Sequence, residues 1–210
     1  MKMFVSVIAL GLSLAGCSSA PPQPSWRLDT QSALTGFTEA YLAGDSSAAR
    51  SDFARARLES SATGDPVAVA QVELLRCAAQ TASLDVDDCS GFTALAGDAS
   101  PSQRAYADYL SGRWQGLDAA LLPEQQRGVA AGAPIAAIAD PLSRLVAAGA
   151  SLRAGKLTPA GIATATETAS TQGWRRPLLA WLGVSIQRAE ALGDATEAAR
   201  LRRRVALAQP

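Results

Sequence analysis

The sequence predicts an all-α protein made of stacked antiparallel helical hairpins. Alanine is abundant, runs of β-branched residues are scarce, and no apolar–polar alternation typical of a half-buried strand persists beyond a few positions. Helix starts are marked repeatedly by a capping residue followed by proline. The connections between expected helices are often very short, which favours antiparallel packing of neighbouring helices.

Four dipeptides join a capping side chain to proline: Asp65-Pro66, Ser100-Pro101, Asp140-Pro141 and Thr158-Pro159. The capping oxygen accepts hydrogen bonds from free backbone N–H groups, and proline at the first helical position lacks only a donor that has no helical partner. Expected helix ends are marked by Gly44, Gly112, Gly155 and Gly193. The predicted helices are 29–43, 46–62, 66–83, 101–112, 114–122, 124–132, 141–154, 159–171, 175–192 and 194–207.

Composition excludes several classes of function. The chain has 210 residues, and its 19 Lys+Arg balance 19 Asp+Glu, which argues against a nucleic-acid partner. It contains no histidine, which removes Ser–His and Cys–His catalysis and His-ligated metal sites. We therefore expect no enzyme, no cofactor and no metal site; catalysis by converging carboxylates is the one enzymatic chemistry left open.

The N-terminal segment has the pattern of an export signal. A basic start, Met1-Lys2, precedes an apolar run over 3–15, which is shorter than the roughly 20 residues of a membrane-spanning helix. The run ends in Leu14-Ala15-Gly16-Cys17, which resembles the lipobox of bacterial lipoproteins. The resemblance implies a signal peptide over 1–16, cleavage before Cys17 and lipidation of Cys17. An ordinary cleaved signal peptide is the alternative.

The same resemblance predicts where the protein resides. Ser18 stands where Asp commonly marks retention in the inner membrane, so we expect a lipid anchor in the outer membrane of a bacterial envelope, facing the periplasm. The proline-rich segment that follows predicts an extended tether over 17–27. A single α-helical domain is expected over 28–210.

Two further cysteines, Cys77 and Cys89, lie twelve positions apart. Because an exported protein folds in an oxidising compartment, they predict a disulfide that ties an acidic loop to the helix carrying Cys77. Two buried thiols are the alternative. The Cys-x-x-Cys spacing of redox-active pairs is absent.

Gly44, Ala49, Phe53 and Ala56 have the spacing of glycine, small, aromatic and small residues that is found in the second half of a tetratricopeptide repeat. The resemblance implies two closely packed helices around a glycine turn. Gly193 and Ala198 repeat the start of the pattern, but no 34-residue period runs through the chain. We expect a tetratricopeptide-like α-solenoid, with a generic helical bundle as the alternative.

Two groups of residues are candidates for binding a partner. An aromatic cluster for a groove is formed by Tyr106, Tyr109 and Trp114. A basic patch for an anionic partner is formed by Arg200, Arg203 and Arg204, and Arg175-Arg176 is expected to extend it if the last hairpin folds as mapped. The alternatives are core packing for the aromatic residues and a solvated helix face for the arginines.

The functional expectation is a lipid-anchored, non-catalytic periplasmic adaptor that binds a protein partner in an envelope assembly, secretion or cell-wall system. Many tetratricopeptide-type lipoproteins serve such machines, so this expectation follows from the resemblance. The alternative is a helical lipoprotein that holds a lipid or cell-wall ligand in an apolar cleft.

Overall fold

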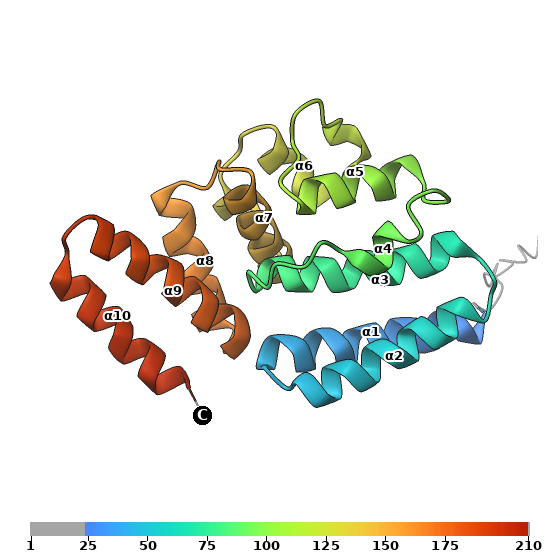
Figure 1. Ribbon diagram of the computed structural model, residues 1–210, viewed down its shortest axis with the longest axis horizontal. Coiled ribbons are helices and arrows are strands. Elements are labelled where there is room, and N and C mark those ends of the chain that lie inside the picture. The colour runs from blue at the N-terminus through green and yellow to red at the C-terminus, as the bar shows by residue number, and fades with distance from the viewer. Residues whose placement is uncertain (1–23, 210) are drawn as a thin grey trace, which may run out of the picture.

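The computed structural model describes residues 24–209, which form ten α-helices, two short 3₁₀ helices and no strand (Figure 1). The predicted all-α class is therefore confirmed. The elements are α1 (Ser25–Ala43), α2 (Ser46–Ser61), α3 (Pro66–Ala82), α4 (Ser90–Thr93), α5 (Pro101–Leu110), η1 (Ala119–Leu121), α6 (Glu124–Ala130), η2 (Ile135–Ala137), α7 (Pro141–Arg153), α8 (Pro159–Thr171), α9 (Arg175–Ala191) and α10 (Ala195–Ala208).

The helix α3 is the centre of the molecule, with α1 and α2 on one side and α5 and α7 on the other (Figure 1). It is apolar over most of its surface and buries more residues than the other helices of the described chain. Gly149 lets α7 cross α3 closely, since a Cβ there would lie 2.1 Å from the Thr81 carbonyl oxygen. Trp181 of α9 is fully buried and donates its indole N–H to the Ala82 carbonyl at 3.0 Å. These contacts make α3 the element on which both halves of the chain are assembled.

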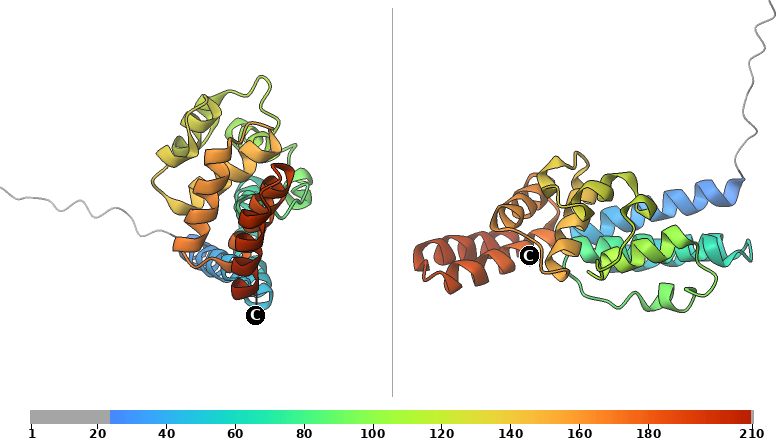
Figure 2. Two further views of the ribbon diagram at one scale, coloured as in Figure 1. Left: turned by 90° about the vertical axis from the view of Figure 1, so that its left-hand side faces the viewer. Right: turned by 90° about the horizontal axis from the view of Figure 1, so that it is seen from above.

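Antiparallel hairpins form the two ends of the elongated body. The α1–α2 hairpin lies beside α3, whereas the α9–α10 hairpin forms the opposite end, with α10 packed mainly on α9 (Figures 1 and 2). Between them, residues 83–140 contain only short helices and irregular connections, apart from the ten-residue α5. The hairpins are therefore not stacked in an uninterrupted series.

The predicted helix starts are confirmed at all four cap–proline sites. The side chains of Asp65, Ser100, Asp140 and Thr158 each accept a hydrogen bond from a backbone N–H in the first turn of the helix that follows. The four glycines at expected helix ends all have positive φ. Local capping chemistry was therefore a reliable guide to most helix boundaries.

Two expectations about the local structure were wrong. The helix predicted over 114–122 is replaced by turns and the three-residue η1, because Gly112 and Gly116 both adopt left-handed backbone conformations within five positions. The expectation that residues 25–27 belong to an extended tether was also wrong, because α1 already begins at Ser25. Cys17, Ser18 and the signal segment lie outside the described residues. No helix within 24–209 combines the length and apolarity needed to cross a bilayer.

Candidate functional site

The aromatic residues predicted to line a groove do come together, with Tyr109 in the core and Tyr106 and Trp114 packed against it. The Tyr109 ring stacks on Trp114 at 4.9 Å and on Tyr106 at 6.3 Å between ring centroids. Tyr109 is fully buried and donates its hydroxyl hydrogen to Gln126 Oε1 at 2.9 Å, while the Trp114 indole N–H donates to the Tyr109 carbonyl. The expectation that Tyr109 lines an accessible groove is therefore wrong, and Tyr106 and Trp114 are only partly exposed.

The arginines of α10 lie along its middle, and two of them have carboxylate partners on the same hairpin. Arg200 binds Glu197 through Nε at 2.6 Å and through Nη2 at 2.7 Å, and Arg202 contacts Glu190. Arg204 donates to Ser170 of α8 at 3.2 Å, and Arg203 is exposed. A groove of about 370 Å³ between α8, α9 and α10 carries acidic residues as well as arginines. The predicted basic patch is therefore a surface of mixed charge.

The residues that resemble a tetratricopeptide repeat pack at helix interfaces. Ala49 is buried beside Phe37 and Tyr41, and Ala56 is buried with Ala33 and Val72. Phe53 lies 5.5 Å from Phe37 between ring centroids. In the last hairpin, Ala198 is buried against Leu182, Ala189 and Leu201. The turn glycines Gly44 and Gly193 have φ values of 92° and 72°.

A pocket of about 270 Å³ lies where α1, α2, α3 and α9 meet. We name it the arginine pocket, and its lining residues are Phe37, Tyr41, Ser46, Ala49, Arg50, Phe53, Arg76, Gln80, Asp85 and Arg176. Its aromatic walls come from α1 and α2, and one guanidinium group comes from each of α2, α3 and α9. This combination was not predicted, because its arginines are up to 126 positions apart in the sequence.

Two of the arginines are held against the aromatic walls. The Arg176 guanidinium lies 4.2 Å from the centroid of the Tyr41 ring, and that of Arg76 lies 5.0 Å from the Phe53 ring. Arg176 also donates to the Tyr41 carbonyl and to Ser46 Oγ, each at 2.7 Å. The cation–π contacts orient both side chains, and the hydrogen bonds further fix that of Arg176. Arg175 and Arg176 thus pack beside the α1–α2 turn, and the expectation that they extend the α10 patch was wrong.

The pocket has an excess of positive charge. Its one lining carboxylate, Asp85, accepts the Tyr41 hydroxyl at 2.7 Å. Burial, reinforced by this hydrogen bond, raises the pKa of Tyr41 well above its usual range, so the phenol stays protonated. Arg76 contacts Glu73 behind the pocket at 3.1 Å, but Arg50 has no ion pair within residues 24–209. The positive charge of Arg50 is therefore available to an incoming anion.

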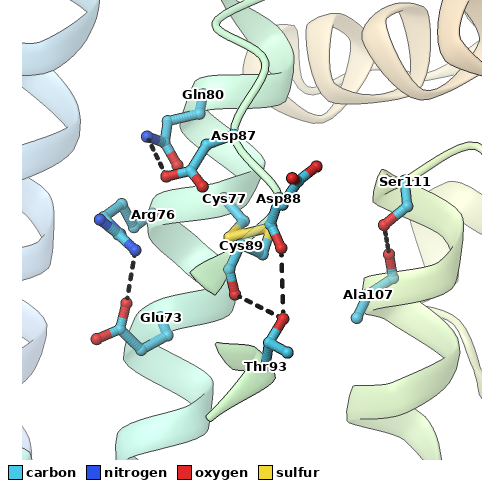
Figure 3. Close-up of a disulfide and its surroundings, with 10 residues drawn as sticks. All are labelled: Glu73, Arg76, Cys77, Gln80, Asp87, Asp88, Cys89, Thr93, Ala107 and Ser111. Atoms are coloured by element: carbon cyan, nitrogen blue, oxygen red, sulfur yellow. Dashed lines mark hydrogen bonds and ion pairs between the residues drawn. A yellow bond between two sulfur atoms is a disulfide. The ribbon is translucent and has the colours of Figure 1, made fainter. Parts of the chain in front are cut away.

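The predicted disulfide between Cys77 and Cys89 is present, and Cys77 lies on the helix that also carries Arg76 and Gln80 of the arginine pocket (Figure 3). Arg76 and Gln80 project from one side of α3, and Cys77 projects toward the loop that carries Cys89 (Figure 3). That loop also carries Asp85, and Asp87, which accepts a hydrogen bond from the Gln80 amide at 3.3 Å. The disulfide therefore restrains the segment that supplies the carboxylate of the pocket.

Two polar atoms beside the pocket, Arg76 Nε and Gln80 Oε1, are buried and have no hydrogen-bond partner in the described part of the chain. A buried polar atom without a partner indicates a further partner such as water or a bound group. Arginine guanidinium groups bind carboxylates in planar, charge-assisted pairs. The arrangement is suited to holding an anionic group, and residues 24–209 contain no cluster of potential metal ligands.

Searches against models of protein families, curated proteins and solved structures each gave no match to this chain.

Proposed function

We propose that this chain is a lipid-anchored, non-catalytic adaptor of the bacterial envelope, tethered to the outer membrane through Cys17 and facing the periplasm. Its partner is an envelope protein, and a carboxylate of that partner docks in the arginine pocket. No cofactor takes part. The adaptor acts by tethering, because a membrane anchor raises the effective concentration of the body near its partner.

The observation that carries this proposal is Arg50, which has no ion pair among the described residues, beside a preformed aromatic and cationic wall. The pocket volume of about 270 Å³ lies just below the 300–1,000 Å³ typical of small-molecule sites. It therefore suits one acidic side chain or a chain terminus better than a whole free ligand. Arginine and aromatic side chains are also the residue types enriched where protein partners bind most strongly.

The proposal is tested by photo-crosslinking in intact cells that carry the full chain, followed by mass spectrometry. Arg50→Glu reverses the charge at an exposed site, so it should abolish the crosslink to the partner and leave the fold intact. The matched control is Arg55→Glu on the same helix, which removes the exposed pair with Asp52 outside the pocket and should keep the crosslink.

Cys17→Ser supplies the second arm of this experiment, because loss of the anchor should reduce the same crosslink. Added salt should weaken the complex formed by the purified chain, as expected for charge-assisted docking. A partner that is captured equally by Arg50→Glu and Arg55→Glu would disprove docking in the arginine pocket. Absence of any anchored partner would disprove the adaptor itself.

A further inference from the structure

A second cleft shares no residue with the arginine pocket. It has a volume of about 390 Å³ and lies between the end of α6, the η2 segment and the start of α8. Val129 and Ile135 are buried beside it, and Trp114 and Leu157 contribute further apolar surface. This size and lining are typical of sites that bury a small apolar ligand.

The cleft is bordered by the longest apolar stretch that follows the signal segment. Residues 128–139 contain no charged side chain, yet most of them are exposed, including Ala131, Ala133 and Pro134. Contiguous apolar surface of this kind marks a binding site more often than scattered apolar residues do. Trp114 is already fixed for contact by its stacking on Tyr109 and its hydrogen bond to the Tyr109 carbonyl.

One charged side chain lines the cleft, and it is Lys156. Lys156 is also the only lysine after Lys2 in the entire sequence, in which all other cations are arginines. It is exposed and forms no ion pair within residues 24–209. A flexible ammonium at the edge of an apolar cleft is suited to a single negative headgroup.

A second hollow, of about 720 Å³ and with a mixed polar and apolar lining, adjoins the cleft. The two hollows share two lining residues, Trp114 and Lys156, and the second is completed by Gly112, Arg113, Gln115 and Ala154. Arg113 is paired with Asp108, at 2.8 Å between Nη2 and Oδ1. The cleft thus opens directly beside a hollow with more polar walls, and Lys156, which has no ion pair within the described residues, lies where the two meet.

We propose that this cleft binds an anionic amphiphile with a single acyl chain, with the chain along the 128–139 segment and the headgroup at Lys156. Burial of the methylene groups supplies the affinity, and the charge-assisted contact with Lys156 selects an anionic head over a neutral one. This activity is independent of the adaptor function and uses a separate surface.

Quenching of tryptophan fluorescence by ω-bromododecanoate tests the proposal on the full lipidated chain in nanodiscs of zwitterionic phosphatidylcholine. The bromine should quench Trp114 saturably, and Trp114→Phe should remove the saturable component while partitioning into the bilayer continues. Lys156→Gln should weaken binding of the acid about tenfold, whereas Lys156→Arg should bind it nearly as well as the wild type.

Two controls separate cleft binding from bilayer partitioning. Neutral ω-bromododecanol should bind wild type and Lys156→Gln alike, because it lacks the charge that Lys156 recognises. Ala160→Phe fills the cleft from an exposed position and should abolish saturable quenching, whereas Ala163→Phe, on the same helix but lining other grooves, should not. Equal binding of the acid by Lys156→Gln and wild type, or quenching that never saturates, would overturn the proposal.

Discussion

The α1–α2 and α9–α10 hairpins are built on the same local device but have different surroundings. In each, a glycine with positive φ ends the first helix, and the aspartate that follows caps the second. Asp45 accepts from the N–H groups of Ser47 and Ala48, and Asp194 accepts from that of Glu197. The local sequence is therefore sufficient to form either hairpin.

The difference lies in what reaches each turn from elsewhere in the chain. At the first turn, Arg175 packs beside Gly44 and Arg176 donates to the Tyr41 carbonyl and to Ser46. At the second turn, no atom of the described chain, apart from those of the adjoining residues, lies within 4 Å of a Cβ placed on Gly193, and Leu192 is 67% exposed. The first hairpin is embedded in the body, whereas the second is peripheral.

This difference explains why the arginine pocket forms at one hairpin only. Its guanidinium groups come from α2, α3 and α9, so it requires a helix that docks from a distant part of the chain. The α9–α10 hairpin has arginines of its own, but Arg200 and Arg202 pair with Glu197 and Glu190 beside them. Long-range packing, rather than arginine content, brings three guanidinium groups together beside aromatic walls.

The largest effect should come from alkaline pH, because it acts on all three tyrosines of the chain together. These tyrosines lie in α1 and α5, outside the α9–α10 hairpin. Burial raises the pKa of Tyr41, Tyr106 and Tyr109 above the ordinary value of 10. Their stabilisation is fully present below the unfolded-state pKa and is lost as the pH rises above it. The free energy of unfolding should fall by about 1.4 kcal/mol per pH unit for each tyrosine. For all three together the slope is roughly 4 kcal/mol per pH unit.

Ultraviolet absorbance of tyrosinate, recorded together with circular dichroism, checks this prediction. The three phenols should ionise only as the helices unfold, with no tyrosine titrating near pH 10 in the native state. Three independent titrations at the ordinary pKa, with helicity retained, would show that these side chains are accessible to solvent and would contradict this prediction.

Removal of the disulfide should sharpen the contrast. Cys77→Ala/Cys89→Ala opens a loop of about a dozen residues, which costs about 2–3 kcal/mol in the chain-entropy model. Chemical denaturation should show this loss. Hydrogen exchange should accelerate in residues 83–89, where the loop carries the Asp85 partner of Tyr41, while exchange in α10 changes little.

Reduction of the wild-type protein serves as the matched comparison, because it opens the same loop without a substitution. The reduced chain and the double variant should show the same pattern of exchange. If exchange in α10 accelerated as much as exchange in residues 83–89, the disulfide would stabilise the whole molecule equally. The two ends would then not differ in their dependence on the disulfide.

The sequence predicted features that depend on neighbouring residues and missed features that depend on distant ones. Asp65 and Ser100 were recognisable as caps because capping involves only the next few backbone groups. One local prediction also failed: no helix forms over 114–122, because Gly116 follows Gly112 so closely that the turns persist. The arginine pocket could not be predicted, because no local pattern shows that Arg176, at the start of α9, docks on Tyr41.

The smallest effect, and the most direct comparison, comes from removing one arginine that contacts the α1–α2 turn and one that pairs within the α9–α10 hairpin. Arg176→Met keeps an unbranched apolar side chain but loses two hydrogen bonds and the contact with the Tyr41 ring, and should lower the free energy of unfolding by about 1 kcal/mol. Arg202→Met breaks an exposed pair with Glu190 and should change it by less than about 0.5 kcal/mol. Urea denaturation measures both.

A double-mutant cycle of Arg176→Met with Ser46→Ala then isolates the contact between α9 and the first turn. The coupling between these side chains should be favourable and should depend little on salt, because Ser46 is uncharged. Arg202 and Glu190 should instead show coupling that salt removes. If Arg176 and Ser46 proved additive while Arg202 and Glu190 were strongly coupled, the second hairpin would be the more firmly held of the two, and docking of Arg176 would not be what builds the arginine pocket.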